Sequence, residues 1–186
     1  MGRCWATVTQ AEVRRCPRNG QGIRWLSPLR SLPWSLLSIF IFLVVARVIA
    51  ADFSGQVVSV LDGDTLEVLH NSRPERLRLS GIDCPEKGQA FGKRAKHAAS
   101  ELTFGREVTL QTFGKDKYGR TIADVLLPDG TNVNQELVKQ GWCWWYRKYA
   151  PGDTVLEGLE MEAREAKKGL WIDPQPVPPW EWRKRK

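Results

Sequence analysis

The sequence predicts an α+β fold, a five-stranded β-barrel accompanied by three helices. Five segments have the composition of strands and are bounded by turn residues: residues 53–60, 65–70, 76–80, 107–113 and 121–127. Three further segments have helical character: residues 89–102, 133–140 and 154–168. The order of three strands, one helix, two strands and two helices matches an OB-type barrel, whose open face often binds oligonucleotides. We expect this domain to span residues 53–171.

The strands are predicted from composition, turns and alternation. The strand over residues 53–60 is followed by the turn dipeptide Asp62-Gly63. In the third strand, Arg76, Arg78 and Ser80 alternate with two leucines. Such alternation is typical of a strand that buries one face and exposes the other.

The helices are predicted from a change of period and from their ends. Phe91, Ala95, Ala98 and Leu102 recur at helical spacing, which indicates an amphipathic helix. Gly169 is expected to end the last helix as its C-cap. The Pro-rich basic tail, residues 172–186, is expected to be extended, either wrapping the domain or lying in solvent.

The first 51 residues read as a leader rather than as a domain. A basic region is followed by the apolar run Leu36–Ala46, which as a helix would be only about 17 Å long against a membrane core of about 30 Å. A signal peptide cleaved near Ala50 and Ala51 is one interpretation, and an uncleaved signal anchor is the other. In either case the domain is expected outside the cytoplasm, secreted or periplasmic.

The net charge of +7 says little about the domain itself. Seven arginines and one glutamate fall in the first fifty residues, which leaves 21 basic against 20 acidic residues in the remainder. Overall charge is therefore a weak argument for a nucleic-acid partner, and local groups of residues must carry that argument.

Two acids lie beside predicted turns at the ends of neighbouring strands. Asp64 opens the second strand and Asp83 follows the third. Two carboxylates, a backbone carbonyl and waters would form an all-oxygen site suited to a hard cation such as Ca²⁺. The alternative is that acids beside Gly and Pro simply form turns.

Two arginines accompany these acids. Arg78 precedes Asp83 by five residues on the same predicted strand, and Arg120 closes the turn that begins at Asp116. A phosphodiester under attack gathers negative charge on its equatorial oxygens, which guanidinium groups match in geometry and charge. Either arginine alone could be a solvated surface group. Together with the acids and Glu86 they provide the metal, the base and the charge clamps that hydrolysis needs.

Three motifs resemble the signatures of the thermonuclease family, whose type member is staphylococcal nuclease. They are Val-Leu-Asp-Gly-Asp-Thr-Leu over residues 60–66, Arg-Leu-Arg-Leu-Ser-Gly-Ile-Asp-Cys-Pro-Glu over 76–86, and Asp-Lys-Tyr-Gly-Arg over 116–120. The resemblance extends through the Asn-x-x-Leu-Val-x-x-Gly motif of residues 134–141 and covers about residues 57–171.

The resemblance implies a role for each matching residue. Asp64 and Asp83 would be the Ca²⁺ carboxylates, and Cys84 would supply a backbone carbonyl where the family commonly has Thr. Glu86 would be the general base, and Arg78 and Arg120 would bind the phosphate. Cleavage of DNA and RNA would leave 3′-phosphate ends.

Aromatic residues follow the site motifs. The resemblance makes Lys117 and Tyr118 the phosphate-contacting pair. Beyond Gly141 the chain is rich in Trp and Tyr, of which Tyr149 and then Tyr146 are candidates to stack on bases. The tryptophans at 142, 144 and 145 could serve the same purpose or could simply be core residues.

Two cysteines remain after the leader, Cys84 and Cys143. In an oxidising compartment they could pair, and two unpaired, partly buried thiols are the alternative. A Cys-based metal site is not expected, since there is no Cys-x-x-Cys motif and no His near either residue.

The sequence therefore predicts a monomeric, Ca²⁺-dependent nuclease acting on DNA and RNA outside the cytoplasm. A non-catalytic OB-fold nucleic-acid binding module is the alternative, although such a module would not need Glu86 with paired arginines. A membrane-anchored protein-interaction domain is a third interpretation, which only the leader favours.

Overall fold

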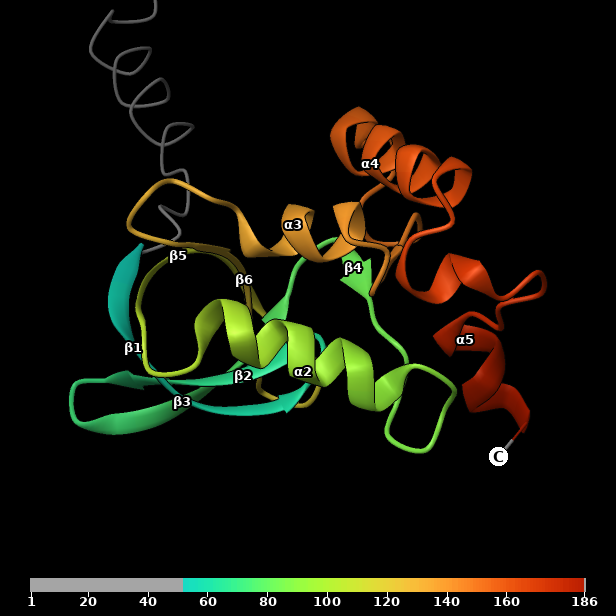
Figure 1. Ribbon diagram of the computed structural model, residues 1–186. Coiled ribbons are helices and arrows are strands. Elements are labelled where there is room, and N and C mark those ends of the chain that lie inside the picture. Colours follow the sequence, from blue (N-terminus) through green and yellow to red (C-terminus); the bar gives the residue numbers. More distant parts are fainter. Residues whose placement is uncertain (1–51, 186) are drawn as a thin grey trace, which may run out of the picture. The chain divides into compact units, whose positions relative to one another are not determined.

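The computed structural model describes residues 52–185 and confirms the five-stranded barrel (Figure 1). The closed barrel has the strand order β1-β2-β3-β6-β5. Its strands are β1 (Phe53–Asp62), β2 (Thr65–His70), β3 (Arg73–Leu79), β5 (Glu107–Lys115) and β6 (Thr121–Leu126). The predicted leader, residues 1–51, lies outside the described residues. Within residues 52–185 no helix has the length and apolar character needed to span a membrane.

Alternation of apolar side chains produces the barrel core. In β6, Thr121, Ala123 and Val125 point inward and are buried, whereas the residues between them are partly exposed. The largest core side chains are almost completely buried and include Leu66, Leu77, Leu79, Val108 and Leu110. Removing this apolar surface from water is the main driving force for closing the sheet.

All neighbouring strands of the barrel are antiparallel except one pair. β3 and β6 run parallel, with Leu77 opposite Thr121 and Arg78 opposite Ile122. This seam closes the barrel. It also brings the two arginine-bearing segments side by side, because Arg120 immediately precedes β6.

Helix α2 (Gly92–Thr103) packs on the barrel through small residues. Ala95, Ala98 and Ala99 are buried, which lets the helix approach β1 closely. The helix starts three residues later than predicted, because residues 89–91 form a tight turn after Glu86. Gly92 is required there, since a Cβ atom would lie 2.2 Å from the Glu86 carbonyl oxygen.

Helices α3 (Val133–Lys139) and α4 (Thr154–Glu165) both begin at side-chain caps. The side chain of Asn132 accepts a hydrogen bond from the Gln135 backbone, and Asp153 accepts two at the start of α4. The prediction that α4 reaches Lys168 and is capped by Gly169 was wrong. The helix ends at Glu165, and Gly169 begins the 3₁₀ helix η1 (Gly169–Ile172).

The sequence did not predict a second, two-stranded sheet. β4 (Ile82–Asp83) pairs with β7 (Trp144–Trp145), placing Asp83 opposite Trp144. Strands of two residues are too short to show a period. Arg78 and Asp83 are therefore not on one strand as predicted, because β3 ends at Leu79 and the chain turns before β4.

The C-terminal tail packs on the domain, as the wrapping alternative predicted, and is not extended throughout. It forms the short helix α5 (Pro179–Trp182) and the 3₁₀ turn η2 (Arg183–Arg185). Pro179 is buried, and the Gln89 side chain donates a 2.6 Å hydrogen bond to the Val177 carbonyl. The tail is thus attached to the loop that precedes α2, as Figure 1 shows.

Candidate active site

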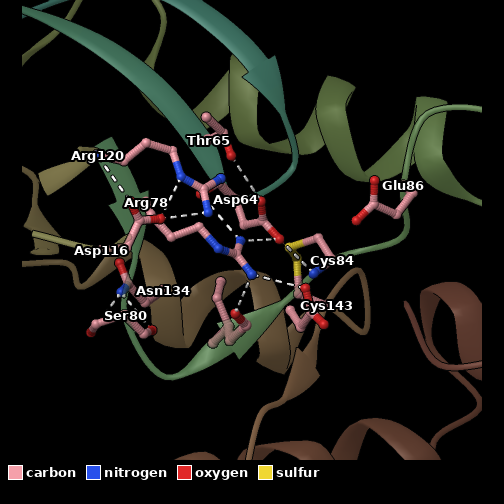
Figure 2. Close-up of polar contacts among 12 residues, drawn as sticks. Asp64, Thr65, Arg78, Ser80, Cys84, Glu86, Asp116, Arg120, Asn134 and Cys143 are labelled. Carbon is pink, nitrogen blue, oxygen red and sulfur yellow. Dashed lines mark hydrogen bonds and ion pairs between the residues drawn. A yellow bond between two sulfur atoms is a disulfide. The ribbon is translucent and has the colours of Figure 1, made fainter. Parts of the chain in front are cut away.

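One guanidinium group brings the two predicted metal-binding acids together. Figure 2 shows this group, that of Arg78, directed at Asp64. Asp64 lies in the turn between β1 and β2, and Asp83 lies in β4. Arg78, from β3, forms an ion pair with Asp64 through Nη1 and donates a 2.8 Å hydrogen bond to Asp83 through Nη2. Asp64 is 7% exposed and Asp83 1%, and the guanidinium compensates both carboxylates for the loss of water.

Backbone and disulfide contacts fix the acidic loop. The Asp64 carboxylate accepts a 2.8 Å hydrogen bond from the Cys84 backbone N–H and one from the Thr65 hydroxyl. Cys84 is joined to Cys143 by a disulfide. The segment that carries Asp83 is therefore tied both to the β1–β2 turn and to the segment before β7.

Burial and two neighbouring charges shift the pKa of Arg78, which is lowered overall. Burial lowers the pKa of its guanidinium, whereas the charge of Asp83 raises that pKa, and the charge of Arg120 lowers it. Both guanidinium groups line the same groove. Arginine keeps its charge at neutral pH, so the site presents two cations that an anion placed between them would stabilise.

Arg120 is held by the turn that precedes it. The Asp116 carboxylate accepts hydrogen bonds from the backbone of Tyr118 and from both the backbone and the side chain of Arg120, the last at 2.7 Å. Burial would raise the pKa of Asp116, but these hydrogen bonds outweigh it and the pKa is lowered overall. The turn therefore contains a charged acid that orients the second arginine.

Glu86 lies in the loop before α2, where its side chain is 34% exposed. Its backbone N–H donates a hydrogen bond to the Gln89 side chain, and its carbonyl accepts one from the Gln89 backbone. Two neighbours of Glu86 were not predicted. The first is Asp62, whose pKa is raised by burial and, to a lesser extent, by the charge of Glu86. The second is Arg183, which donates a hydrogen bond to the Glu86 carboxylate. The Asp-Gly-Asp-Thr motif could have indicated Asp62, but no local signal indicates Arg183.

A groove beside the two arginines contains the predicted nucleotide-binding residues. Its lining residues include Arg78, Arg120, Lys117, Tyr118, Tyr146 and Tyr149. Tyr118 and Tyr149 are each 71% exposed, so both rings can meet a ligand. Tyr146 instead stacks on Trp180 from the tail. Trp144 and Trp145 are buried, which assigns them to the core.

The donor set suits a hard cation. Asp64, Asp83 and the Cys84 carbonyl offer oxygen atoms only, because the Cys84 sulfur is in the disulfide. Within residues 52–185, no three His, Cys, Asp or Glu side chains gather closely enough to hold a metal. A cation here would therefore keep several waters among its ligands, as Ca²⁺ and Mg²⁺ do.

Comparisons with known proteins agree with this geometry. The family described as staphylococcal nuclease homologue matches residues 76–173. An uncharacterized endonuclease of Escherichia coli O157:H7 is 45% identical over 150 residues, which are 81% of this chain and 97% of that protein. A micrococcal nuclease of Shigella flexneri is 44% identical over 153 residues, or 77% and 88% of the two chains. Protein ParB of Escherichia coli is 43% identical over 151 residues, or 76% and 85%.

The family match begins at β3 and contains Arg78, Asp83, Glu86 and Arg120, while the relatives extend the similarity over most of the chain. The chain therefore belongs to the staphylococcal nuclease homologue family and is a nuclease.

Proposed function

We propose that this nuclease is Ca²⁺-dependent, acts outside the cytoplasm, and cuts DNA and RNA to leave 3′-phosphate ends. The observation that carries the proposal is the Arg78 guanidinium bridging two buried carboxylates beside a second arginine. An all-oxygen site next to paired guanidinium groups combines a place for a hard cation with a place for a phosphate.

Each side chain has a distinct task in the proposed hydrolysis. Asp64, Asp83 and the Cys84 carbonyl would hold the cation, which when bound supplies positive charge next to the phosphate. Arg78 and Arg120 donate hydrogen bonds to the equatorial phosphate oxygens, where negative charge grows in the transition state. Glu86 accepts a proton from the attacking water. The water oxygen forms the new bond to phosphorus, the bond to the 5′-oxygen breaks, and that oxygen takes up a proton.

The groove supports binding of an unpaired strand. Tyr118 and Tyr149 offer exposed rings for stacking on bases, and Lys117 lies beside the Tyr118 ring, where it can meet a phosphate. Stacking of this kind is worth about 1–3 kcal/mol per base and does not depend on sequence. We therefore propose a preference for single-stranded substrate, whether DNA or RNA.

The disulfide supports a location in an oxidising compartment. Disulfides persist in secreted and periplasmic proteins and are rare in the cytosol. Alkylation and mass spectrometry of protein from cell fractions test this proposal. Recovery of the oxidised protein outside the cytoplasm supports it, and recovery of a cytoplasmic protein with free Cys84 and Cys143 contradicts it.

The central experiment measures cleavage of single-stranded DNA by the full chain in Ca²⁺ or in chelator, beside the Glu86→Gln variant. We expect cutting only with Ca²⁺ and a loss of at least about 100-fold in the variant, as for removal of a general base. The ends are identified by a phosphatase step, because a 3′-phosphate blocks extension by a polymerase until it is removed. Undiminished cutting in chelator would refute the metal assignment, and an unchanged rate for Glu86→Gln would refute the base assignment.

A further inference from the structure

The C-terminal tail reaches two of the candidate site residues with one side chain. Arg183 donates hydrogen bonds of 3.3 Å and 2.6 Å to the two Asp83 oxygens, and one of 2.7 Å to Glu86. These partners raise the pKa of Arg183 although its partial burial opposes the rise. Residues 83 and 183 are a hundred positions apart in the sequence, so the fold of the tail produces this contact.

The segment that carries Arg183 is anchored. The Gln89 side chain donates to the Val177 carbonyl while its oxygen accepts the Glu86 backbone N–H. One amide thus connects the tail to the loop of the candidate base. Trp180 stacks on Tyr146 with ring centroids 5.2 Å apart and meets the Trp144 ring edge-on. Aromatic contacts of this kind favour one docked position over a range of solvated ones.

Arg183 and a bound cation require the same oxygen atoms. One Asp83 oxygen accepts from Arg78 and weakly from Arg183. Among the described residues, the other accepts from Arg183 alone. Each oxygen of this buried carboxylate is therefore occupied by a guanidinium nitrogen. Glu86 is also paired with Arg183.

We propose that the tail is a built-in competitor of the metal ion: Arg183 docks on Asp83 and Glu86 when the cation is absent and must leave when it binds. The inference rests on the cation site of the proposed function. In this scheme the tail sets the metal concentration at which the nuclease becomes active.

In competition of this kind, the apparent metal affinity is the intrinsic affinity multiplied by the fraction of molecules whose site is open. If the tail is docked in about nine of ten molecules, the apparent Kd for Ca²⁺ is about tenfold higher than the intrinsic one. Loosening the tail should therefore tighten metal binding.

The test is calorimetric titration of the full chain with Ca²⁺, using three variants. Arg183→Gln removes the competing guanidinium, and we expect its Kd to fall about tenfold. Trp180→Ala loosens the tail at unchanged net charge, and we expect its Kd to fall several-fold. Lys184→Gln is the matched control, because it removes one positive charge from the next, exposed residue. We expect it to change Kd by less than about twofold, as a screened charge would.

Hydrogen exchange of the peptide covering residues 178–183 gives a readout independent of activity. The backbone N–H groups of Glu181 and Trp182 both donate to the Pro178 carbonyl in the docked tail. We expect Ca²⁺ to speed their exchange in the wild-type chain, and Arg183→Gln to show fast exchange without Ca²⁺.

The outcomes separate the two proposals. Tighter binding in both Arg183→Gln and Trp180→Ala, with faster exchange, supports the competition. Wild-type affinity in both variants, with exchange unaffected by Ca²⁺, overturns the competition but leaves the metal site standing. If Arg183→Gln and Lys184→Gln tighten Ca²⁺ binding equally, the effect comes from net charge alone, and this result also overturns the competition. Failure of every protein to bind Ca²⁺ overturns the proposed metal site and the competition with it.

Discussion

Reduction of the disulfide should remove about 4 kcal/mol from the free energy of unfolding. Cys84 and Cys143 are 59 positions apart, so the bond closes a loop of about 60 residues. In the loop-entropy model, a cross-link of that span removes about 14 cal/mol/K from the entropy of the unfolded chain, or about 4 kcal/mol at 25 °C. This amounts to a large part of the total stability of an ordinary domain, which is about 5–15 kcal/mol.

The perturbation can be made in two ways that should agree. A reductant opens the bond in the wild-type chain and leaves both sulfur atoms in place. Replacing both cysteines with alanine removes the bond and two buried sulfur atoms, since Cys84 is 3% exposed and Cys143 is completely buried. The double variant should therefore lose slightly more than reduction alone, because small cavities add to the lost cross-link.

The assay is urea unfolding monitored by circular dichroism, with the free energy taken from linear extrapolation. The oxidised wild type, the reduced wild type and the double variant are compared, and the double variant must not respond to reductant. Unfolding free energies of the oxidised and reduced wild type that agree to within about 0.5 kcal/mol would refute the reasoning. Detection of Cys84 and Cys143 themselves as free thiols before reduction, by alkylation and peptide mass spectrometry, would refute its premise.

Three further perturbations follow from the site and its supports. Gly169→Ala should destabilise the fold by at least about 1 kcal/mol, because φ at this residue is +55° and a Cβ atom would lie 2.2 Å from the Gly141 carbonyl oxygen. Gly158→Ala is the control and should stabilise slightly, because this position on α4 faces open space. Thermal unfolding measures both. The pKa of the Asp116 carboxyl is lower in the folded chain than its unfolded-state value of 3.8, so the charged carboxylate stabilises the fold at any pH above 3.8. This stabilisation is lost as the pH falls through the lower, folded-state pKa. Urea unfolding between pH 5 and about 2 should accordingly show a weaker pH dependence in Asp116→Asn, and an identical pH dependence would contradict it. Arg78→Gln should abolish cutting and cost about 3–5 kcal/mol of stability, because it leaves the buried Asp64 carboxylate without its ion pair, although Asp83 keeps Arg183. Wild-type unfolding midpoints would disprove the second part.

The sequence predicted the parts of the fold that are local or periodic. The five barrel strands were found because their side chains alternate or because Gly, Pro and Asp bound them. Long-range pairing was not accessible in the same way. β4 and β7 consist of two residues each, and nothing in either pair of residues indicates its partner.

In the candidate site too, residues in local motifs could be predicted and residues brought in by long-range contacts could not. Asp64, Asp83, Glu86 and the two arginines could be identified because they lie in compact motifs. Arg183 belongs to a run of four basic residues at the chain end, which in isolation favours a solvated tail. Its docking depends on the rings of Trp144 and Tyr146 and on the amide of Gln89, all distant in sequence. The sequence left open whether the tail wraps the domain or is solvated, because local composition does not contain those contacts.

The parallel pairing of β3 with β6 has a consequence for how the enzyme gains its activity during folding. Residues 77–79 must find residues 121–123 across α2 and β5, so this seam carries a larger chain-entropy cost than the hairpins and should form late. Arg78 lies in the seam and Arg120 lies at its edge. A partly folded chain with its hairpins formed but its barrel open would have Arg78 and Arg120, the two arginines proposed to bind phosphate, apart. The candidate site can therefore be complete only after this long-range seam has formed, and not in a chain that has formed its hairpins alone.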